Sequence, residues 1–371
     1  MKRLLACFFA LIFLLTLSLP CYAEGLSVSA KSAILMDAST GQVLYQKNAF
    51  VRMPMASTTK IMTALVAIES VDLEKEIEVS PDATGIEGSS IYLYPNERLT
   101  MEALLYALML ESANDAATAI AIAVAGNTEA FAEKMNQKAE ALELCDTHFE
   151  NPHGLDGAEH YTTAYDLAKL TSYALSNRTF LKICSTYKMK IPLNTDEGVR
   201  VLVNHNKMLH LYDGAIGVKT GFTKKSGRCL VSAAEREGLR LVAVTLSAPD
   251  DWDDHKAMLD FGFSRYVRKA FAQEGKYSVS LPVVNGKGET VTAVNSDELS
   301  ATLKKEHGEI TYRIEAPRFL YAPVKKGDVV GKVVCVCDGK EIATSSLVAS
   351  ESVNTAARNG FFAWLLSIFR K

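Results

Sequence analysis

Residues 54–68 read PMASTTKIMTALVAI, and this stretch decides the fold because it predicts the start of a buried helix. Pro54 ends whatever precedes it, and Ser57 or Thr58 is expected to cap the helix. The residues that follow are apolar over most of the helix surface, which indicates burial. Ser57 and Lys60 are three residues apart, so a helix places their side chains side by side on one face.

This pairing of a hydroxyl with an amine is a candidate for nucleophilic chemistry. A serine at a helix N-terminus lies beside free backbone N–H groups and the positive end of the helix dipole. A lysine next to it, once partly shielded from water, loses its proton more easily and can act as a base. The same spacing recurs at Ser185 and Lys188 in polar surroundings, and for either copy the alternative is a capped helix with a surface lysine. The apolar helix around the first copy favours Ser57 and Lys60.

The composition is that of a globular protein: 371 residues, of which 48% are hydrophobic and 22% charged, enough for about two domains. Residues 1–23 differ, because Lys2 and Arg3 precede an apolar run that ends in small residues at Ala23. This predicts a secretory signal peptide cleaved after Ala23. An uncleaved membrane anchor is the alternative, but the run is short for a bilayer span. Cleavage would lower the net charge from −3 to −5, and no basic surplus points to nucleic acid as a partner.

The cysteines do not form a recognisable framework. Beyond residue 23 they are Cys145, Cys184, Cys229, Cys335 and Cys337, an odd and scattered set. The last two lie on one face of a predicted strand, where a direct disulfide would be strained, so buried thiols are expected. No Cys/His spacing suggests zinc, and we expect neither a metal nor another cofactor.

The order of predicted elements indicates an α/β fold of the α+β type. A hairpin within 32–48 and another at 228–246 should belong to one antiparallel sheet, flanked by helices, with a helical subdomain inserted between its halves. Residues 72–98 read as a loop region with short strands. The predicted helices lie at 101–110, 114–124, 129–144, 163–176 and 256–267.

Four segments follow from these patterns: a signal peptide at 1–23, a catalytic domain at 24–272, a small all-β domain at 273–350 and a tail at 351–371. The β domain is predicted from strand-like runs at 277–284, 289–294, 309–316, 329–337 and 341–348. The tail holds FFAWLLSIF at 361–369 between basic residues, too short to span a bilayer but suited to its interface. A terminal helix docked on the protein is the alternative.

A second motif, Ser112-Ala113-Asn114, falls between two predicted helices. A turn between buried helices can direct both polar side chains into a cleft, where the hydroxyl and the amide can donate and accept hydrogen bonds. The alternative is that Asn114 caps the Ala-rich helix that follows. Because Ser-x-Asn recurs at 352–354, the pattern alone is a weak signal.

The third motif is Lys219-Thr220-Gly221, inside the segment GVKTGFT at 217–223. On a strand, Lys219, Gly221 and Thr223 face the same way and present a cation, a gap and a hydroxyl. The gap is predicted to let an extended peptide approach and pair with the strand edge, and the cation and hydroxyls suit a terminal carboxylate. An ordinary edge strand kept soluble by its lysine is the alternative.

Together and in this order, the three motifs resemble the active-site signature of penicillin-binding proteins and serine β-lactamases. The segments MPMASTTK at 53–60, ESANDAA at 111–117, NPHGLD at 151–156 and GVKTG at 217–221 resemble the low-molecular-weight D-alanyl-D-alanine carboxypeptidases. The layout of signal peptide, catalytic domain, small β domain and amphipathic tail is also similar. The resemblance therefore covers essentially the whole mature chain.

The resemblance implies a serine-type D-alanyl-D-alanine carboxypeptidase that takes the terminal D-alanine from peptidoglycan stem peptides and is inhibited by β-lactams. Ser57 would be the nucleophile that forms the acyl-enzyme, and Lys60 would take its proton. Ser112 would relay a proton towards the leaving amine, and Asn114 would hold the substrate amide. No metal is implied. The protein would lie on the outer face of the cytoplasmic membrane, held to its surface by the tail.

The resemblance also assigns the strand motif. Lys219 would help to keep Lys60 neutral and, with Thr220, would lie near the substrate carboxylate. The backbone N–H groups of Ser57 and Phe222 match the oxyanion hole, which stabilises the tetrahedral intermediate. Two lysines near one serine raise each other's cost of being charged, so one pKa falls towards neutrality.

Two departures from the family pattern matter. The central triplet is Ser-Ala-Asn rather than Ser-Asp-Asn, which the carboxypeptidases tolerate. Some relatives bind the terminal carboxylate with an arginine after the last hairpin, but here DDWDDH at 250–255 holds none, so Thr220, Thr223 and Lys219 are the candidates. No motif places a glutamate as a dedicated deacylation base, which argues mildly against a β-lactamase. The alternatives are a β-lactamase or D,D-endopeptidase on the same scaffold, and a non-catalytic wall-binding protein.

Overall fold

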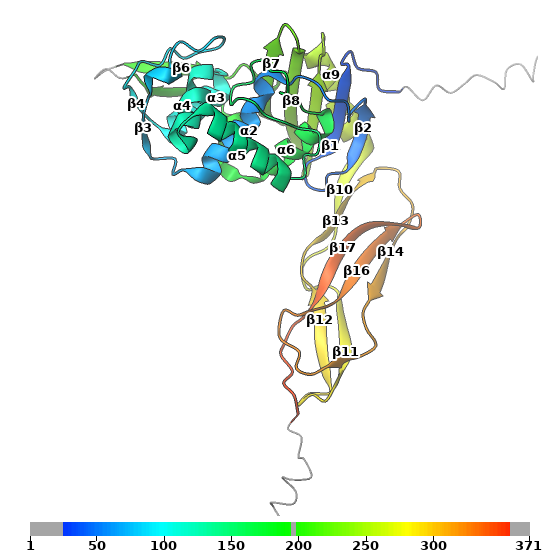
Figure 1. The fold of residues 1–371 in the computed structure, drawn as a ribbon. Coiled ribbons are helices and arrows are strands. Elements are labelled where there is room, and N and C mark those ends of the chain that lie inside the picture. The colour runs from blue at the N-terminus through cyan, green and yellow to red at the C-terminus, as the bar shows by residue number, and fades with distance from the viewer. Residues whose placement is uncertain (1–24, 194–197, 357–371) are drawn as a thin grey trace, which may run out of the picture.

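The computed structural model describes residues 25–193 and 198–356. A larger domain is built around one sheet, and an elongated β domain extends from it (Figure 1). Between them lies a two-stranded ribbon of β10 (Tyr266–Ala272) and β13 (Leu299–Lys304). The signal peptide expected at 1–23 and the apolar segment at 361–369 lie outside the described residues. None of the helices within the described ranges is long and apolar enough to cross a bilayer.

The central sheet has five strands in the order β2-β1-β9-β8-β7, each antiparallel to its neighbours. Strands β1 and β9 lie next to each other although about 200 residues separate them. This confirms the predicted antiparallel sheet, whose two halves come from the two ends of the domain. The strands are β1 (Ser32–Asp37), β2 (Val43–Lys47), β7 (Ala215–Thr223), β8 (Gly227–Arg236) and β9 (Leu239–Leu246).

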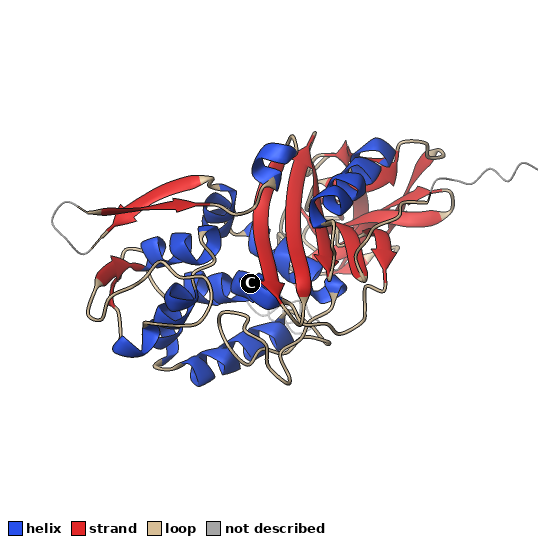
Figure 2. Cartoon of the chain, turned by 90° about the horizontal axis from the view of Figure 1, so that it is seen from above, coloured by secondary structure: helices blue, strands red, loops and turns tan. Residues whose placement is uncertain are grey.

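The chain between β2 and β7 forms a helical block that covers one face of the sheet, while helix α9 (Asp251–Arg265) covers the other (Figure 2). Ile34 and Val244 pack on the block, whereas their chain neighbours Leu35 and Ala243 pack on the α9 side. Because both faces are covered, β1 and β9 are apolar on both faces rather than alternating.

The helices of the block are α2 (Lys60–Ser70), α3 (Met101–Leu110), α4 (Asn114–Ala125), α5 (Thr128–Ala141), α6 (Ala164–Ser176) and α7 (Arg178–Ser185). The short helix α8 (Met208–Leu211) precedes β7, and its Met208 packs on the α9 side of the sheet. Two 3₁₀ turns, η1 (Ala56–Thr59) and η2 (Pro81–Ala83), and two short strand pairs complete the block. The pairs are β3 (Glu76–Glu78) with β4 (Arg98–Thr100), and β5 (Lys188–Pro192) with β6 (Val199–Val203). The predicted helices at 101–110, 114–124, 129–144 and 163–176 are confirmed, the third to within a few residues.

Two local predictions were wrong, and one alternative is excluded. Ser57 and Thr58 do not cap α2, because they lie in the 3₁₀ turn η1 and the helix begins at Lys60 with no side-chain cap. Asn114 does not cap α4 either, since it is the first helical residue and Ala113 precedes it as the N-cap residue. Helix α9 begins at Asp251 rather than Lys256, in the acidic run that the sequence analysis left outside the helix.

The C-terminal domain is a six-stranded sheet in the order β14-β16-β17-β12-β11-β15. All neighbouring strands are antiparallel except the short β15, which runs parallel to β11. The strands are β11 (Ser278–Val284), β12 (Thr290–Asn295), β14 (Ile310–Glu315), β15 (Leu320–Tyr321), β16 (Val329–Cys337) and β17 (Lys340–Ala349). The five predicted strands are confirmed. Cys335 and Cys337 are free and buried, as predicted.

Candidate active site

Ser57 lies in the tight turn η1, where every other hydroxyl is occupied. Thr58 Oγ1 donates to the Met55 carbonyl at 2.6 Å, and Thr59 Oγ1 donates to the Ala56 carbonyl at 2.8 Å. Ala56 is held at φ 47°, in the left-handed region that residues other than glycine rarely adopt. The turn therefore buries the two threonines and leaves the Ser57 hydroxyl facing an open cavity.

Lys60, on the first turn of α2, is fully buried. Its Nζ lies 3.0 Å from Ser57 Oγ, 2.7 Å from Asn114 Oδ1 and 2.6 Å from the His153 carbonyl oxygen. Burial lowers its pKa well below the usual value, the nearby charge of Lys219 lowers it further, and Asp115 opposes the shift. The predicted pair of a hydroxyl and an amine with lowered pKa is therefore present.

The orientation of the Asn114 amide is determined by its surroundings. Its Nδ2 donates to the Glu87 carbonyl, so Oδ1 must be the atom that faces Lys60. The backbone N–H of Asn114 also donates to the Ser89 carbonyl at 2.7 Å. Asn114 thus joins the helix α4, the loop before it and the amine of Lys60.

The loop at 151–154, part of the NPHGLD segment, lies against the start of α2. Thr63 Oγ1 donates to the Pro152 carbonyl at 2.6 Å, one turn beyond the contact between Lys60 and the His153 carbonyl. Gly154 has φ +90°, and a Cβ there would lie 2.0 Å from the Ala56 carbonyl oxygen. Only glycine allows this approach, so the glycine of the motif sets the distance between the loop and η1.

A buried histidine, His160, and a half-buried one, His153, support this region as neutral rings. His160 Nδ1 accepts the Glu150 backbone N–H at 3.0 Å, so its Nε2 carries the proton and donates to Thr59 Oγ1 at 2.8 Å. Burial lowers the pKa of His160 to about 4 and that of His153 to about 3, and the charge of Lys60 contributes to both shifts. These rings are structural parts of the site that the sequence analysis did not single out.

Strand β7 brings the Lys219-Thr220-Gly221 motif against η1. Lys219 is buried, its Nζ donates to the Thr220 carbonyl at 3.0 Å, and burial lowers its pKa to about 7. A Cβ at Gly221 would lie 3.1 Å from the Ser57 nitrogen and 3.2 Å from the Met55 carbonyl oxygen. The space beside the Gly221 Cα is therefore taken by the turn that carries Ser57. Gly221 also lines the cavity, and β7 is the free edge of the sheet, so the pairing of an extended peptide with this strand stays a prediction.

A cavity of about 390 Å³ opens beside Ser57. The Ser112 hydroxyl is buried in the wall of this cavity and has no hydrogen-bond partner among the described residues. Ser112 has φ 59°, which turns the chain between α3 and α4. The residues lining the cavity are Ser57, Ser89, Ser112, His205, Lys207, Thr220, Gly221, Phe222, Arg228, Asp251 and Trp252.

Arg228 is a cavity residue that the sequence analysis missed. It lies opposite Phe222 in the β7–β8 register, and its Nε and Nη2 donate to Asp251 Oδ1 at 3.0 and 2.8 Å. Asp251 is buried, and its pKa is raised by burial although Arg228 opposes the shift. By contrast, Thr223 was predicted as a ligand of the substrate carboxylate, and its Oγ1 instead forms hydrogen bonds with the side chains of Asp156 and Ser226. An arginine at the start of a core strand gave no sequence signal, because only the turn before it directs it into the cavity.

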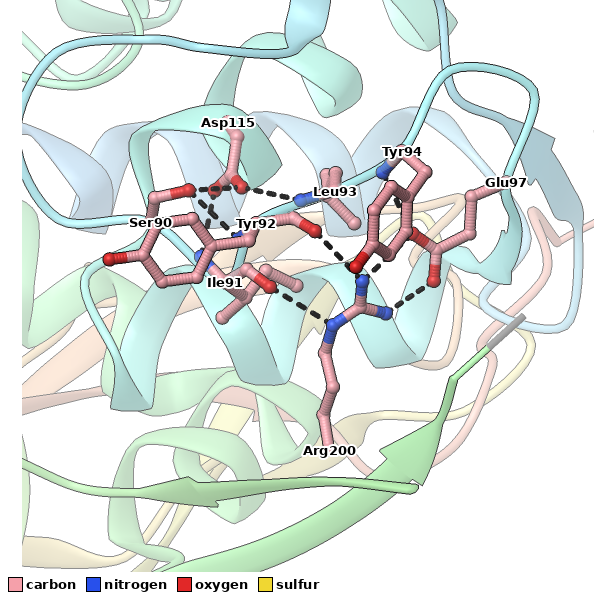
Figure 3. A network of polar contacts seen from close by, with 8 residues as sticks. All are labelled: Ser90, Ile91, Tyr92, Leu93, Tyr94, Glu97, Asp115 and Arg200. Atoms are coloured by element: carbon pink, nitrogen blue, oxygen red, sulfur yellow. Dashed lines mark hydrogen bonds and ion pairs between the residues drawn. The ribbon is translucent and has the colours of Figure 1, made fainter. Parts of the chain in front are cut away.

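The loop at 85–97 forms a further wall of the site, and its inner side is held by Asp115 (Figure 3). The buried carboxylate of Asp115, next to Asn114 on α4, accepts the Ser90 hydroxyl at 2.6 Å. It also accepts the backbone N–H groups of Ile91 at 3.3 Å and Leu93 at 3.0 Å. The residue that follows the motif asparagine thus anchors the loop whose carbonyls orient that asparagine.

The outer side of the same loop is held by Arg200 from strand β6 (Figure 3). Its guanidinium donates to the carbonyls of Ile91 and Tyr92, both at 3.0 Å, and forms an ion pair with Glu97. Glu97 is fully buried, and its Oε2 also accepts the Tyr94 backbone N–H at 3.1 Å. The β5–β6 hairpin, which the sequence analysis did not predict, therefore supports the loop from outside.

The second copies of the Ser-x-x-Lys and Ser-x-Asn patterns lie away from the cavity. Ser185 ends helix α7 with its hydroxyl bonded to the Lys182 carbonyl, and Lys188 is exposed on β5. Asn354 lies in the C-terminal domain. Within the described ranges, no group of three or more His, Cys, Asp or Glu side chains is arranged to hold a metal ion.

Comparison with known proteins gives the same result as this geometry. Residues 20–250 match the family model of D-alanyl-D-alanine carboxypeptidases, peptidase family S11. The chain belongs to this family. Residues 266–355 of the carboxypeptidase match the model of the C-terminal domain of penicillin-binding protein 5. It is thus a serine D-alanyl-D-alanine carboxypeptidase of the penicillin-binding type, and the β-lactamase, endopeptidase and non-catalytic alternatives are not favoured.

Relatives match over most of the carboxypeptidase. D-alanyl-D-alanine carboxypeptidase DacF of Bacillus subtilis is 34% identical, over 98% of this chain and 97% of that protein. DacC of Escherichia coli is 31% identical, over 91% and 87%. The structure of penicillin-binding protein 5 from Haemophilus influenzae superimposes with a TM-score of 0.78 at 28% identity, covering 88% of this chain and 98% of that one.

Proposed function

We propose that Ser57 attacks the carbonyl carbon of the penultimate D-alanine of a peptidoglycan stem peptide and forms an acyl-enzyme with it. The observation that carries this assignment is the set of three partners around Lys60 Nζ. Asn114 Oδ1 and the His153 carbonyl can only accept hydrogen bonds. A neutral amine has two N–H groups, which these acceptors use. Its lone pair is then left for Ser57 Oγ, 3.0 Å away, so the hydroxyl proton passes to Lys60 as the C–O bond forms.

The remaining steps use the other side of the cavity. The backbone N–H groups of Ser57 and Phe222 are the proposed oxyanion donors, worth roughly 2.7–4 kcal/mol each to the transition state. The Ser112 hydroxyl, buried and without a partner among the described residues, is the proposed relay. It would pass a proton to the amine of the terminal D-alanine as the C–N bond breaks. Water then hydrolyses the ester, and Lys60 and Ser57 return to their starting protonation.

Arg228 is our candidate for the cation that binds the substrate's terminal carboxylate. Its guanidinium has five N–H donors, and Asp251 uses two of them on one edge. The pairing holds the side chain in place against Trp252, whose ring centroid lies 5.8 Å from the Arg228 Cζ. Thr220 and Lys219 would add a hydroxyl and a positive charge nearby. Lys207 also lines the cavity, but in this structure it has no ion pair with a described residue to position it.

A comparison of Arg228→Gln with Lys207→Gln tests this assignment. We expect Arg228→Gln to raise KM for a peptide ending in D-Ala-D-Ala by about 30-fold, with a smaller change in kcat, because a charge-assisted pair is lost. For a substrate whose C-terminus is amidated, and which therefore has no terminal carboxylate, Arg228→Gln should raise KM only slightly. The double variant Arg228→Gln/Asp251→Asn avoids a buried unpaired carboxylate, and it should show the same increase in KM as Arg228→Gln. Equal effects at Lys207 and Arg228 would contradict the assignment.

The cellular location is also part of this proposal. The sequence of residues 1–23 supports export across the cytoplasmic membrane, and that of 361–369 supports peripheral attachment to its outer face. There the enzyme would trim stem peptides during wall synthesis and so influence cell shape. Intact mass of the exported protein should show an N-terminus at Glu24.

The nucleophile is tested by replacing Ser57 with alanine. Wild-type protein should release D-alanine from a D-Ala-D-Ala peptide and gain one covalent benzylpenicillin, which peptide mapping should locate at Ser57. The Ser57→Ala protein should do neither, whereas Ser185→Ala, in the second copy of the Ser-x-x-Lys pattern, should do both. Labelling of Ser57→Ala would refute the assignment. Fast turnover of a chromogenic β-lactam, rather than a stable adduct, would favour the β-lactamase alternative.

A further inference from the structure

The C-terminal domain carries a group of exposed apolar side chains at the end far from the active site. Val284 ends strand β11, and its register partner Tyr321 ends β15. Their exposed fractions are 39% for Val284, 45% for Phe319 and 66% for Tyr321, and the rings of Phe319 and Tyr321 meet edge to face at 5.4 Å. These three residues, which we call the end patch, form one continuous surface across two neighbouring strands.

The end patch lies where the chain leaves the domain. The Ala356 backbone N–H donates to the Asn285 carbonyl at 2.8 Å, and Asn285 follows Val284 directly. The Lys287 backbone N–H donates to the Asn354 carbonyl at the same distance. Phe361 is five residues beyond Ala356, so even a fully extended chain puts it within about 18 Å of Ala356, which is bonded to the residue next to the patch. In Figure 1 this exit point is at the opposite end of the molecule from the helical block.

We infer that the end patch contacts the lipid headgroup region of a bilayer, as a second contact beside the apolar C-terminal segment. The inference rests on the proposed membrane attachment and extends it to a surface of the folded domain. A tyrosine and a phenylalanine with exposed rings suit the interface, where an apolar body and a polar tip are both satisfied. If the segment at 361–369 enters the interface, the patch cannot be far from it, because only residues 357–360 separate Phe361 from Ala356, whose backbone N–H bonds the Asn285 carbonyl beside the patch.

The charges around the patch fit a headgroup surface. Lys287, Lys325 and Lys326 are exposed in the loops beside it. Glu289 and Asp328 are the acidic neighbours, and the Asp328 carboxylate is engaged by the Lys325 backbone N–H at 2.8 Å. The balance is only slightly basic, so the aromatic side chains should carry most of the binding and anionic lipid should add to it. A second protein copy or the C-terminal segment itself are the other occupants that the test separates.

The first experiment measures binding of the full mature chain to vesicles of phosphatidylcholine and phosphatidylglycerol. We expect the double variant Phe319→Ser/Tyr321→Ser to bind about tenfold more weakly than wild type. The matched control is Tyr312→Ser/Ile314→Ser, because these side chains are 44% and 41% exposed on β14, the opposite edge of the same sheet. It should bind like wild type. Penicillin labelling should be unchanged in both variants, so a failure of the catalytic assignment would be seen separately.

The second experiment places the patch relative to the lipid. Phe319→Trp in a Trp364→Phe background should be quenched by brominated lipid, whereas Tyr312→Trp in the same background should not. The constant signal of Trp252 is subtracted with the background protein. Bound protein in which Trp at 319 is not quenched would overturn the inference and point to the C-terminal segment or a second copy on the patch. If wild-type protein does not bind vesicles at all, both the inference and the proposed attachment fail, while the enzymatic assignment stands.

Discussion

The amine of Lys60 is surrounded by groups that decide its protonation. It is fully buried, it lies near a second lysine, and two of its three partners are carbonyl oxygens from Asn114 and His153. Neither partner is charged, so nothing in contact with the amine repays the cost of keeping it protonated. The Glu87 carbonyl, which turns the Asn114 amide, is as much a part of this arrangement as the motif residues.

Lys219 should act on the pH profile through Lys60. Replacing it with glutamine removes one cause of the lowered Lys60 pKa, so that pKa rises. Because only the neutral amine is a base, the acid limb of the rate of acylation by benzylpenicillin should move to higher pH. The measurement is the acylation rate from pH 5 to 9. Lys207→Gln is the control. An unchanged acid limb in Lys219→Gln would show that the charge of Lys219 does not affect the pKa of Lys60.

Among the elements, the β5–β6 hairpin has the least expected role. It reaches across to the 85–97 loop through Arg200, while Asp115 holds the other side of the loop (Figure 3). That loop supplies the carbonyls of Glu87 and Ser89, which bind Asn114. Hydrogen bonds and an ion pair therefore connect the hairpin, through the loop, with the Asn114 amide beside Lys60.

Arg200→Gln should lower both stability and acylation. It leaves the fully buried Glu97 carboxylate without its cation, which typically costs about 3–5 kcal/mol of unfolding free energy. The double variant Arg200→Gln/Glu97→Gln should recover most of the stability, because no unpaired charge is left. If the hairpin positions Asn114, acylation should stay slow in the double variant although the protein is stable. Urea unfolding and stopped-flow acylation measure the two effects, and full recovery of both would show that the pair is only structural.

Much of the element order follows from the sequence, and the exceptions share a cause. Apolar periodicity locates α3, α4 and α6 within a residue or two, because their buried faces follow from local pattern. The β5–β6 hairpin was missed because its strands are only five residues each and its role depends on Arg200 meeting Glu97, 103 positions away in the sequence. The start of α9 was missed because partners distant in sequence bind two of the carboxylates of its acidic first turn: Arg228 pairs with Asp251, and Asp254 accepts from Ser29 and Ala30.

The candidate site divides in the same way. The motifs located Ser57, Lys60, Ser112, Asn114 and Lys219, since each stands in a recognisable segment. The carbonyls of Glu87 and His153 could not be found, because a backbone oxygen carries no residue identity and its direction depends on the folded loop. Arg228 could not be found either, because it stands in no recognisable motif. Gly221 was recognised from its motif, but its close contact with the turn that carries Ser57 could not be predicted, because that contact depends on the folded position of the turn.

The whole catalytic domain should be sensitive to acid. His153, His160 and His255 have pKa values lowered by burial to about 3, 4 and 3. The unfolded chain binds protons at these rings near pH 6.5, and the folded chain does not, so their stability contribution is complete above about pH 6.5. It is lost as the pH falls towards 4, with a slope of up to about 1.4 kcal/mol per pH unit for each ring.

Denaturant unfolding between pH 7.5 and 4.5 measures this slope. His160→Gln keeps a donor for Thr59 but removes one titrating group, so it should unfold more easily at pH 7 and show a shallower acid slope. His307→Gln, at a half-buried site outside the catalytic domain, is the control and should leave the slope unchanged. An identical slope in wild type and His160→Gln would show that this ring does not contribute.

The adjacency of β1 and β9 has a consequence for how the enzyme is made. Ser57 is synthesised early, but the cation-bearing strands follow more than 150 residues later, and β9 is the strand that joins them to β1. A nascent polypeptide therefore carries its nucleophile without a complete site until β9 has been made, about half of the chain length later. We expect reactivity towards penicillin only once Leu246 can pair with Ser32 and close the sheet.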